Sequence, residues 1–211
     1  AGFSFAVPAS SFADADAGDS LTLSATLADG SPLPAWLSFN PATQTFSGTP
    51  LNDDVGSLSI RVTATDTSGA SATQDFQVTV NNTNEAPVIT SSGAASFAEN
   101  AAGTVYTAAA TDVDAGATLT YSISGADAAL FNIDATTGVV TFKSSPNYEA
   151  PGDAGGNNVY DITVGASDGT VTTTKDVAIS VTNINEGPVF TSATTASFAE
   201  TASGAAYTAA A

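Results

Sequence analysis

Carboxylates are the main side chains of this sequence that could carry chemistry, because the chain contains no His, no Cys and no Met. Zinc and iron–sulfur ligation, thiol nucleophiles, disulfides and Ser-His-Asp catalysis are therefore excluded. Asp and Glu total 21 against 3 Lys and Arg, which gives a formal net charge of -18. Without a basic stripe the chain cannot displace counterions from nucleic acids or anionic membrane surfaces, so neither is an expected partner.

The acidic residues recur in short motifs. An Asp-x-Asp motif occurs at Asp14 and Asp16 and again at Asp112 and Asp114. Ca²⁺ is a hard ion that takes six to eight oxygens at about 2.3–2.6 Å, and Asp, Glu, Asn and backbone carbonyls supply such oxygens. Because clustered carboxylates repel one another when no cation neutralises them, these motifs indicate candidate Ca²⁺ ligands.

Internal repetition shows how the chain is organised. The segment 84–90 recurs as 185–191, and the tetrapeptide Ser-Phe-Ala-Glu of residues 96–99 recurs at 197–200, both after 101 residues. Self-similarity at a fixed period is typical of tandem arrays. We therefore expect one unit over residues 1–86, a second over 87–187 and the start of a third over 188–211.

Alternating apolar and polar residues predict half-buried strands within the units, at 57–62, 76–80, 118–124 and 161–166. Turn sequences that place Asp or Ser before Gly separate these runs. The Ala-rich segment 106–110 could be read as helix, but it is too short to form one by propensity alone, so we expect a strand. No apolar run is long enough for direct membrane insertion. The chain is predicted to be all-β.

The second unit resembles a bacterial cadherin repeat in the order and spacing of its motifs. These motifs are Ser96-Phe97-Ala98-Glu99-Asn100, Asp112-Val113-Asp114, the turn 131–138, Asn147-Tyr148-Glu149, Val164-Gly165-Ala166-Ser167-Asp168 and Asn183-Ile184-Asn185-Glu186-Gly187-Pro188. The first unit is similar to the dystroglycan-type cadherin-like module, in the segments 12–19, 33–39, 46–50, 54–56 and 63–66. The resemblance implies tandem immunoglobulin-like (cadherin-like) Greek-key β-sandwiches.

In these families Ca²⁺ lies at the joints between successive modules, so the resemblance also implies ligands. The joint between the first two units would use Asn84, Glu85, Asp112, Asp114 and Asp168, with Asp54 from the first unit. The joint after the second unit would use Glu99, Glu149, Asn185 and Glu186, and the outer end of the first unit would use Asp14, Asp16 and Asp66. The position equivalent to the family's base Glu in the first unit is Ala1, so that Glu is either missing or cut away, and we expect the joint between the first two units to bind fewer ions or to bind them more weakly.

Several residues leave alternatives open. Asp19 and Asp53 fit a ligand and a plain loop residue equally well, whereas Asp134 is explained by an Asx-turn. Trp36 could stack on a sugar, but a place in the sandwich core is the favoured interpretation. Paired carboxylates can act in glycosidases. Acids at the ends of small modules do not form such a cleft, so no enzyme is expected.

These features together predict Ca²⁺-binding extracellular repeats of a bacterial surface adhesin or matrix protein, located at the cell surface. Its expected partners are neighbouring repeats of the same chain. Other cadherin-like modules and surface polysaccharide are the alternatives that the sequence leaves open as further partners. One alternative is a polysaccharide-binding accessory module of a secreted carbohydrate-active protein. Another is a spacer that binds only Ca²⁺ and separates distant domains.

Overall fold

The computed structural model describes residues 2–16, 18–192, 194–197, 199–200, 203–204 and 209. The all-β prediction is confirmed, since the described residues contain no α-helix and only the 3-10 turns Asn52–Asp54 and Ala128–Leu130. Accordingly, none of the described helices is long and apolar enough to cross a bilayer. Ala1 and much of the expected third unit fall outside the described residues.

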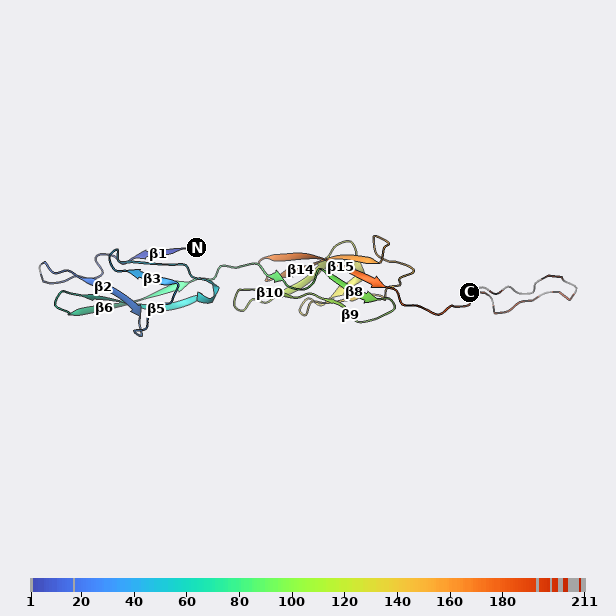
Figure 1. The fold of residues 1–211 in the computed structure, drawn as a ribbon, viewed down its shortest axis with the longest axis horizontal. Coiled ribbons are helices and arrows are strands. Elements are labelled where there is room, and N and C mark those ends of the chain that lie inside the picture. Colours follow the sequence, from blue (N-terminus) through green and yellow to red (C-terminus); the bar gives the residue numbers. More distant parts are fainter. Residues whose placement is uncertain are drawn as a thin grey trace. The chain divides into compact units, whose positions relative to one another are not determined.

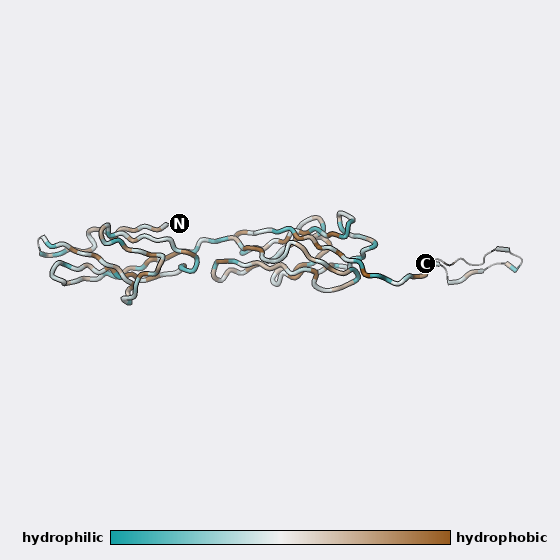
Figure 2. The backbone as a smooth tube through the Cα atoms, viewed as in Figure 1, coloured by the Kyte–Doolittle hydropathy of each residue, from teal (hydrophilic) through white to brown (hydrophobic). Residues whose placement is uncertain are grey.

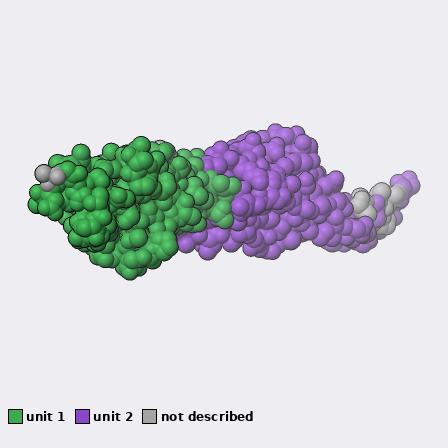
Figure 3. Space-filling model, turned by 60° about the vertical axis from the view of Figure 1, so that its left-hand side comes forward, with its two compact units in different colours: residues 1–88, 111–119, 167–172 green, residues 89–110, 120–166, 173–211 purple. Residues whose placement is uncertain are grey.

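The chain forms two compact units (Figure 3). The first comprises residues 1–88 together with the loops 111–119 and 167–172, and the second comprises 89–110, 120–166 and 173–211. Figure 2 shows hydrophobic residues recurring along the strands of both units. Each unit has its own cluster of buried apolar side chains, so each has the core that a domain requires.

The first unit is a sandwich of two three-stranded sheets, ordered β1-β4-β3 and β2-β5-β6 (Figure 1). Its strands are β1 (Phe3–Ala6), β2 (Thr22–Leu27), β3 (Leu37–Asn40), β4 (Thr45–Gly48), β5 (Gly56–Thr65) and β6 (Ser71–Val80). Alternation decides which side chains face inward: Ile60, Val62 and Ala64 of β5 are buried. Trp36 is half-buried and packs against this core, as its favoured interpretation required.

The second sandwich has a four-stranded sheet ordered β11-β14-β15-β8 and a three-stranded sheet ordered β12-β13-β9, with β10 and β7 forming a short pair. Its strands are β7 (Val88–Ile89), β8 (Ala94–Ala98), β9 (Thr104–Thr107), β10 (Ala110–Thr111), β11 (Thr120–Ser124), β12 (Phe131–Ile133), β13 (Val139–Phe142), β14 (Val159–Ser167) and β15 (Thr172–Thr182). Residues 106 and 107 lie in β9 and residue 110 in β10, with 108 and 109 in neither strand nor helix, so the expectation of strand over helix is confirmed for three of the five residues.

The turn between β12 and β13 is organised by Asp134 and Gly138. Asp134 Oδ1 accepts hydrogen bonds from the backbone N–H groups of Thr136 (2.8 Å) and Thr137 (2.9 Å), which is the predicted Asx-turn. Gly138 has a φ of 70° and its carbonyl accepts from the N–H of Ala108. The turn therefore fixes how β13 meets the neighbouring β9.

A first prediction concerns Gly138→Ala. An added Cβ would collide with the backbone oxygen of Ala108, whereas at Gly156, which has a similar φ of 63°, nothing lies within 4 Å. Gly156→Ala should cost about 1–2 kcal/mol from the left-handed backbone alone. Gly138→Ala should lose about 1–3 kcal/mol more, because neither backbone can yield easily. Urea unfolding of both variants measures the difference, and equal losses would contradict this packing.

A second prediction uses the pKa of Asp134, which the N–H groups of Thr137 and Thr136 lower from its ordinary value of 3.8. A lowered folded-state pKa adds stability that is present above the unfolded pKa and is lost as pH falls through the folded pKa. Asp134→Asn keeps an acceptor oxygen but does not titrate. The stability advantage of the native protein over this variant should be constant above about pH 5 and shrink below about pH 4. An advantage independent of pH between 2 and 6 would refute the charged-acceptor account.

Candidate metal centres

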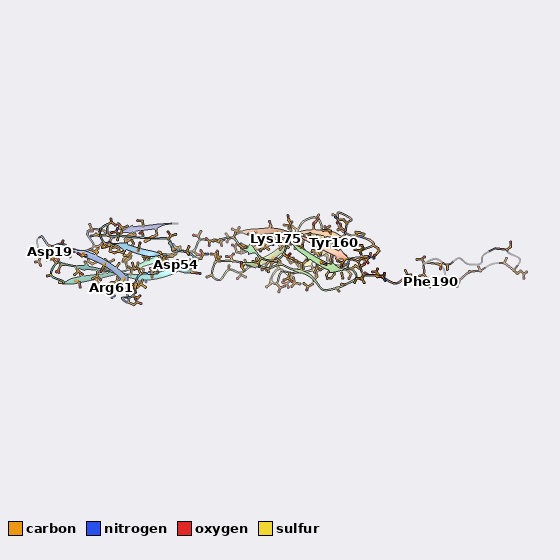
Figure 4. The ribbon with its side chains drawn as sticks, in the orientation of Figure 1. Asp19, Asp54, Arg61, Tyr160, Lys175 and Phe190 are labelled. Atoms are coloured by element: carbon orange, nitrogen blue, oxygen red, sulfur yellow. The ribbon has the colours of Figure 1, made fainter. Side chains whose placement is uncertain are left out.

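Acidic and amide side chains gather in three clusters in loops at the ends of the sandwiches. In two of the clusters carboxylate oxygens of three residues lie within 4.8 Å of one another, and in the other the residues are joined by hydrogen bonds. We name them the linker cluster (Asn84, Glu85, Asp112, Asp114 and Asp168), the base cluster (Glu99, Glu149 and Glu186) and the N-terminal cluster (Asp14, Asp19 and Asp66). In Figure 4, Asp19 and Asp54 lie toward opposite ends of the first unit. Strand ends place these side chains together although they are far apart in sequence.

Backbone and amide hydrogen bonds hold the linker cluster in place. Asp112 and Asp114 follow β10, and Asp168 follows β14. The Asn84 amide donates to Asp168 Oδ2 (2.9 Å), and the N–H of Glu85 donates to Asp114 Oδ2 (2.9 Å). The N–H groups of Val171 and Thr170, together with the Asn84 amide, lower the pKa of Asp168 below its ordinary value. Asp168 is therefore held in its ionised form at neutral pH.

Two oxygens of the linker cluster are buried without any hydrogen-bond partner, Asp112 Oδ2 and Asp114 Oδ1. Each side chain has its other oxygen engaged, since Asp112 Oδ1 accepts from the N–H of Asp114 (2.9 Å). Leaving a buried acceptor unsatisfied costs about 1–3 kcal/mol, and more for a charged group. Two such oxygens on neighbouring carboxylates make this cluster a candidate cation site.

No basic side chain of the chain is available for that role. The sequence has only three Lys and Arg residues. Arg61 forms an ion pair with Asp75 (2.7 Å), and Lys143 and Lys175 donate to backbone carbonyls elsewhere in the second unit. A cation that neutralises Asp112 and Asp114 must therefore come from solution.

The first unit contributes two further side chains near the linker. Asn52, in the 3-10 turn after β4, donates to Glu85 Oε2 (3.1 Å) and so orients that carboxylate. Asp54, a predicted ligand, accepts from the N–H of Leu51 through Oδ2 (2.8 Å) and so caps the same turn. Asn52 belongs to none of the acidic motifs, so the sequence did not predict a role for it. Its hydrogen bond to Glu85 in the structure is what identifies it as a residue that orients a candidate ligand.

The base cluster centres on Glu99, whose side chain is 0% exposed. Its two oxygens accept from the N–H groups of Tyr148 (2.8 Å) and Ile184 (2.8 Å), which lower its pKa below the ordinary value. One carboxylate oxygen each of Glu99, Glu149 and Glu186 lies within 4.8 Å of the others. This geometry places three negative charges together and offers oxygen ligands on one side of a buried anchor.

Asparagine amides donate hydrogen bonds to one carboxylate oxygen each of Glu149 and Glu186 in the base cluster. Asn183 donates to Glu149 Oε1 (2.7 Å), and Asn100 donates to Glu186 Oε1 (2.6 Å). Asn185, a predicted ligand, directs its amide toward the carbonyl of Glu186 (3.4 Å). Asn100 and Asn183 lie within motifs that the sequence singled out, but the spacing alone did not indicate these pairings.

The N-terminal cluster reproduces part of the linker geometry within the first unit. Asp14 Oδ1 accepts from the N–H of Asp16 (2.9 Å), as Asp112 does from Asp114. Carboxylate oxygens of Asp14, Asp66 and Asp19 lie within 4.8 Å of one another, so the structure brings Asp19 into the group. The predicted Asp16 is exposed and is not one of these three.

Hydrogen bonds hold Asp19 and Asp66 of the N-terminal cluster in place. The Thr67 hydroxyl donates to Asp19. The hydroxyl and N–H of Ser68 and the N–H of Ala70 donate to Asp66, and the Ser68 hydroxyl is the main cause of its lowered pKa. Asp19 could not be separated from an ordinary loop residue by sequence, because its partner Thr67 lies on a different loop.

The donor set decides which chemistry the clusters can support. Carboxylate oxygens, side-chain amide oxygens and backbone carbonyls are hard ligands that suit Ca²⁺ or Mg²⁺, and the chain has no sulfur or imidazole ligand for softer metals. The two unpartnered oxygens of the linker cluster fit such an ion.

Comparison with known proteins places both units. Residues 94–182 match the family model "Cadherin domain", and residues 1–81 match the model "Putative Ig domain". No curated protein matches the sequence.

Solved structures with the same fold include a mouse cadherin-23 fragment, EC22-24, and a human protocadherin-24 fragment, EC1-2. The first is 23% identical with a TM-score of 0.54, covering 78% of this chain and 53% of that chain. The second is 19% identical with a TM-score of 0.54, covering 79% and 83%. The chain thus spans about half the length of the mouse fragment. Residues 94–182 therefore match a cadherin domain, and residues 1–81 match the "Putative Ig domain" family, on a fold shared with these cadherin fragments.

Proposed function

We propose that this chain is a pair of Ca²⁺-binding extracellular repeat modules from a bacterial surface adhesin or matrix protein. The observation that carries the proposal is the pair of buried, unpartnered oxygens, Asp112 Oδ2 and Asp114 Oδ1. Hydrogen bonds to the opposite oxygens set the orientation of both carboxylate groups. The cadherin family of the second module favours Ca²⁺ as that ion.

In this proposal, Asp112, Asp114 and Asp168 hold the ion together with oxygens of Asn84 and Glu85. The last two residues lie in the segment that joins β6 to β7, so the ion fixes this segment to the end of the second sandwich. Ion binding and ordering of the segment are then linked, because the ligands converge only in the ordered state. Asp54 serves as a cap, and Asn52 as the positioning residue for Glu85.

The other two clusters serve further joints in the same way. Glu99, Glu149, Glu186 and Asn185 would hold ions shared with a module over residues 188–211 and beyond, and Asp14, Asp16, Asp19 and Asp66 would face a preceding module. This assigns the module boundaries 1–86 and 87–187. The repeated segments at an offset of 101 residues support this division.

The role that follows is mechanical and adhesive, without catalysis. Ions at successive joints would stiffen a string of modules outside the cell, and its partners would be neighbouring repeats and further cadherin-like modules. The polysaccharide-binding alternative has less support, because Tyr106 and Tyr160 are buried and Trp36 packs against the core. An exposed row of aromatic side chains is what sugar stacking would require.

Asp114→Asn tests the linker cluster. The substitution keeps the shape and an acceptor for the N–H of Glu85 but removes one negative charge, so Ca²⁺ affinity should fall at least tenfold while the second sandwich stays folded. Asp29→Asn removes the same charge from an exposed turn of the first unit and is the control. Calorimetric titration of both variants, with circular dichroism for folding, gives the result. Unchanged affinity in Asp114→Asn would refute this ligand assignment.

The stiffening role is tested separately by small-angle scattering of chelator-treated protein before and after Ca²⁺ addition. Because ion binding orders the joining segment, the distribution of intramolecular distances should narrow and its maximum should lengthen. Mg²⁺ at the same concentration is the control for screening, since its smaller octahedral shell suits this many-oxygen site less well. If Ca²⁺ binds but the scattering profile does not change, the Ca²⁺ assignment would stand and the stiffening role would be refuted.

A further inference from the structure

Strand β2 forms one edge of the sheet β2-β5-β6, and no strand of the described residues pairs with its outer side. The N–H of Ala28 donates to the carbonyl of Ser59, which continues the register of β2 on β5. Opposite residues of an antiparallel pair exchange backbone hydrogen bonds at every second position. Every second residue back from Ala28 therefore bonds to β5. The residues between them, Leu23, Ala25 and Leu27, direct their N–H and carbonyl groups outward.

The turn after β2 closes only one end of this outer side. The N–H of Leu27 donates to the carbonyl of Ser31 (2.8 Å), and the N–H of Gly30 donates to the carbonyl of Leu27 (2.9 Å). Within the described residues, the outward backbone groups of Leu23 and Ala25 have no such partner. Four backbone donors and acceptors are therefore left for an added strand.

The second module closes the corresponding edge with its own chain. Its order β11-β14-β15 corresponds to β2-β5-β6, so β11 is the counterpart of β2. There the N–H of Tyr121 donates to the carbonyl of Ala135 (2.8 Å), in the turn that Asp134 organises. The additional strand β8 joins the sheet at the opposite edge, on β15. The open side of β2 therefore belongs to the first module and lies away from the edge that β8 covers in the second.

Strand β2 lacks the devices that usually protect an unpaired edge. Such edges carry charged side chains, proline or a β-bulge that turns the strand away. The sequence of β2 is Thr-Leu-Ser-Ala-Thr-Leu, without charge or proline, and its register with β5 is unbroken from Thr22 to Leu27. The strand thus offers a straight, uncharged edge for pairing.

An open groove of about 490 Å³ follows this edge. The four consecutive residues 23–26 line it, together with Leu33 and Phe39. Because consecutive strand residues point to opposite faces, a groove that contacts all four runs along the edge itself. Leu23 and Ala25 turn their side chains toward the core, where Leu33 and Phe39 also pack. The side chains of an added strand that lie opposite Leu23 and Ala25 would enter this apolar groove.

Charge indicates which kind of strand fits the groove. No side chain that lines it is charged, and Arg61 on the neighbouring strand is already paired with Asp75 (2.7 Å). Asp29 lies exposed in the turn that ends β2, and the whole chain has a net charge of -18. A basic segment is attracted by this field, whereas a second copy of the chain carries the same negative charge and is repelled.

We propose that the edge of β2 and the groove beside Phe39 accept an extended segment of a partner protein. This segment has two apolar residues separated by one polar residue, with Lys or Arg at its ends. Backbone hydrogen bonds to Leu23 and Ala25 provide affinity, the two apolar side chains fill the groove, and a basic end lies near Asp29. The site adds a protein partner to the module and does not rest on the proposed Ca²⁺ sites.

Amide hydrogen exchange of the full chain, measured by NMR with and without the peptide Lys-Ser-Val-Thr-Val-Ser-Lys, tests the proposal. In the free chain the amides of Leu23 and Ala25 should exchange faster than that of Ser24, which is bonded to β5. Saturating peptide should slow Leu23 and Ala25 by about tenfold or more, because their N–H groups gain acceptors. The amide of Tyr121, already bonded to Ala135, is the internal control and should not change. No binding at millimolar peptide, or binding that leaves Leu23 and Ala25 unchanged, would overturn the proposal.

Two matched peptides and one variant separate the parts of the proposal. The peptide with Ser in place of both Val residues should not bind, and the peptide with Glu in place of both Lys residues should bind more weakly. Ala25→Pro removes an outward N–H but none of the bonds to β5, so it should abolish binding while circular dichroism stays native. Equal binding of the Lys and Glu peptides would refute the basic partner. Exchange at Leu23 and Ala25 that slows with protein concentration alone would instead assign the edge to a second copy of the chain.

Discussion

Neutralisation of clustered carboxylates is the constraint on which the rest of the structure depends. The chain has 21 acidic and 3 basic side chains, and the basic ones are engaged elsewhere on the sandwiches. At the linker cluster two carboxylate oxygens are nevertheless buried without a partner. Burying like charges together is costly without a compensating charge. In the proposed function, a cation from solution supplies that charge.

The β-sandwich positions these carboxylates through its loops. Each sandwich has its own apolar core, which holds the strand ends, and the loops that leave these strands present Asp and Glu side chains oriented by backbone N–H groups. Asp66 and Asp168 illustrate the device, since each is fixed by N–H groups two to four residues later along its own loop. Glu99 extends it across the sandwich, joining the loop at Tyr148 to the segment at Ile184. These hydrogen bonds set the orientation of the carboxylates in each loop.

The sequence predicted those features that depend on local pattern. Alternation located β5, β6, β11 and β14, and the Asp-to-Gly spacing located the Asx-turn at Asp134. It did not predict that Asp19 joins Asp14 and Asp66, or that Asn52 orients Glu85, because those contacts join loops distant in sequence and have no periodic signature.

The central claim is that Asp112 Oδ2 and Asp114 Oδ1 are metal ligands. A crystal structure of the chain grown with Ca²⁺, with the ion identified by its anomalous signal, tests this claim most directly. The account predicts an ion about 2.3–2.6 Å from both oxygens, with Asp168 in the same shell. Crystals in which these two oxygens instead bind ordered water or a protein donor, with Ca²⁺ absent or bound elsewhere, would contradict it.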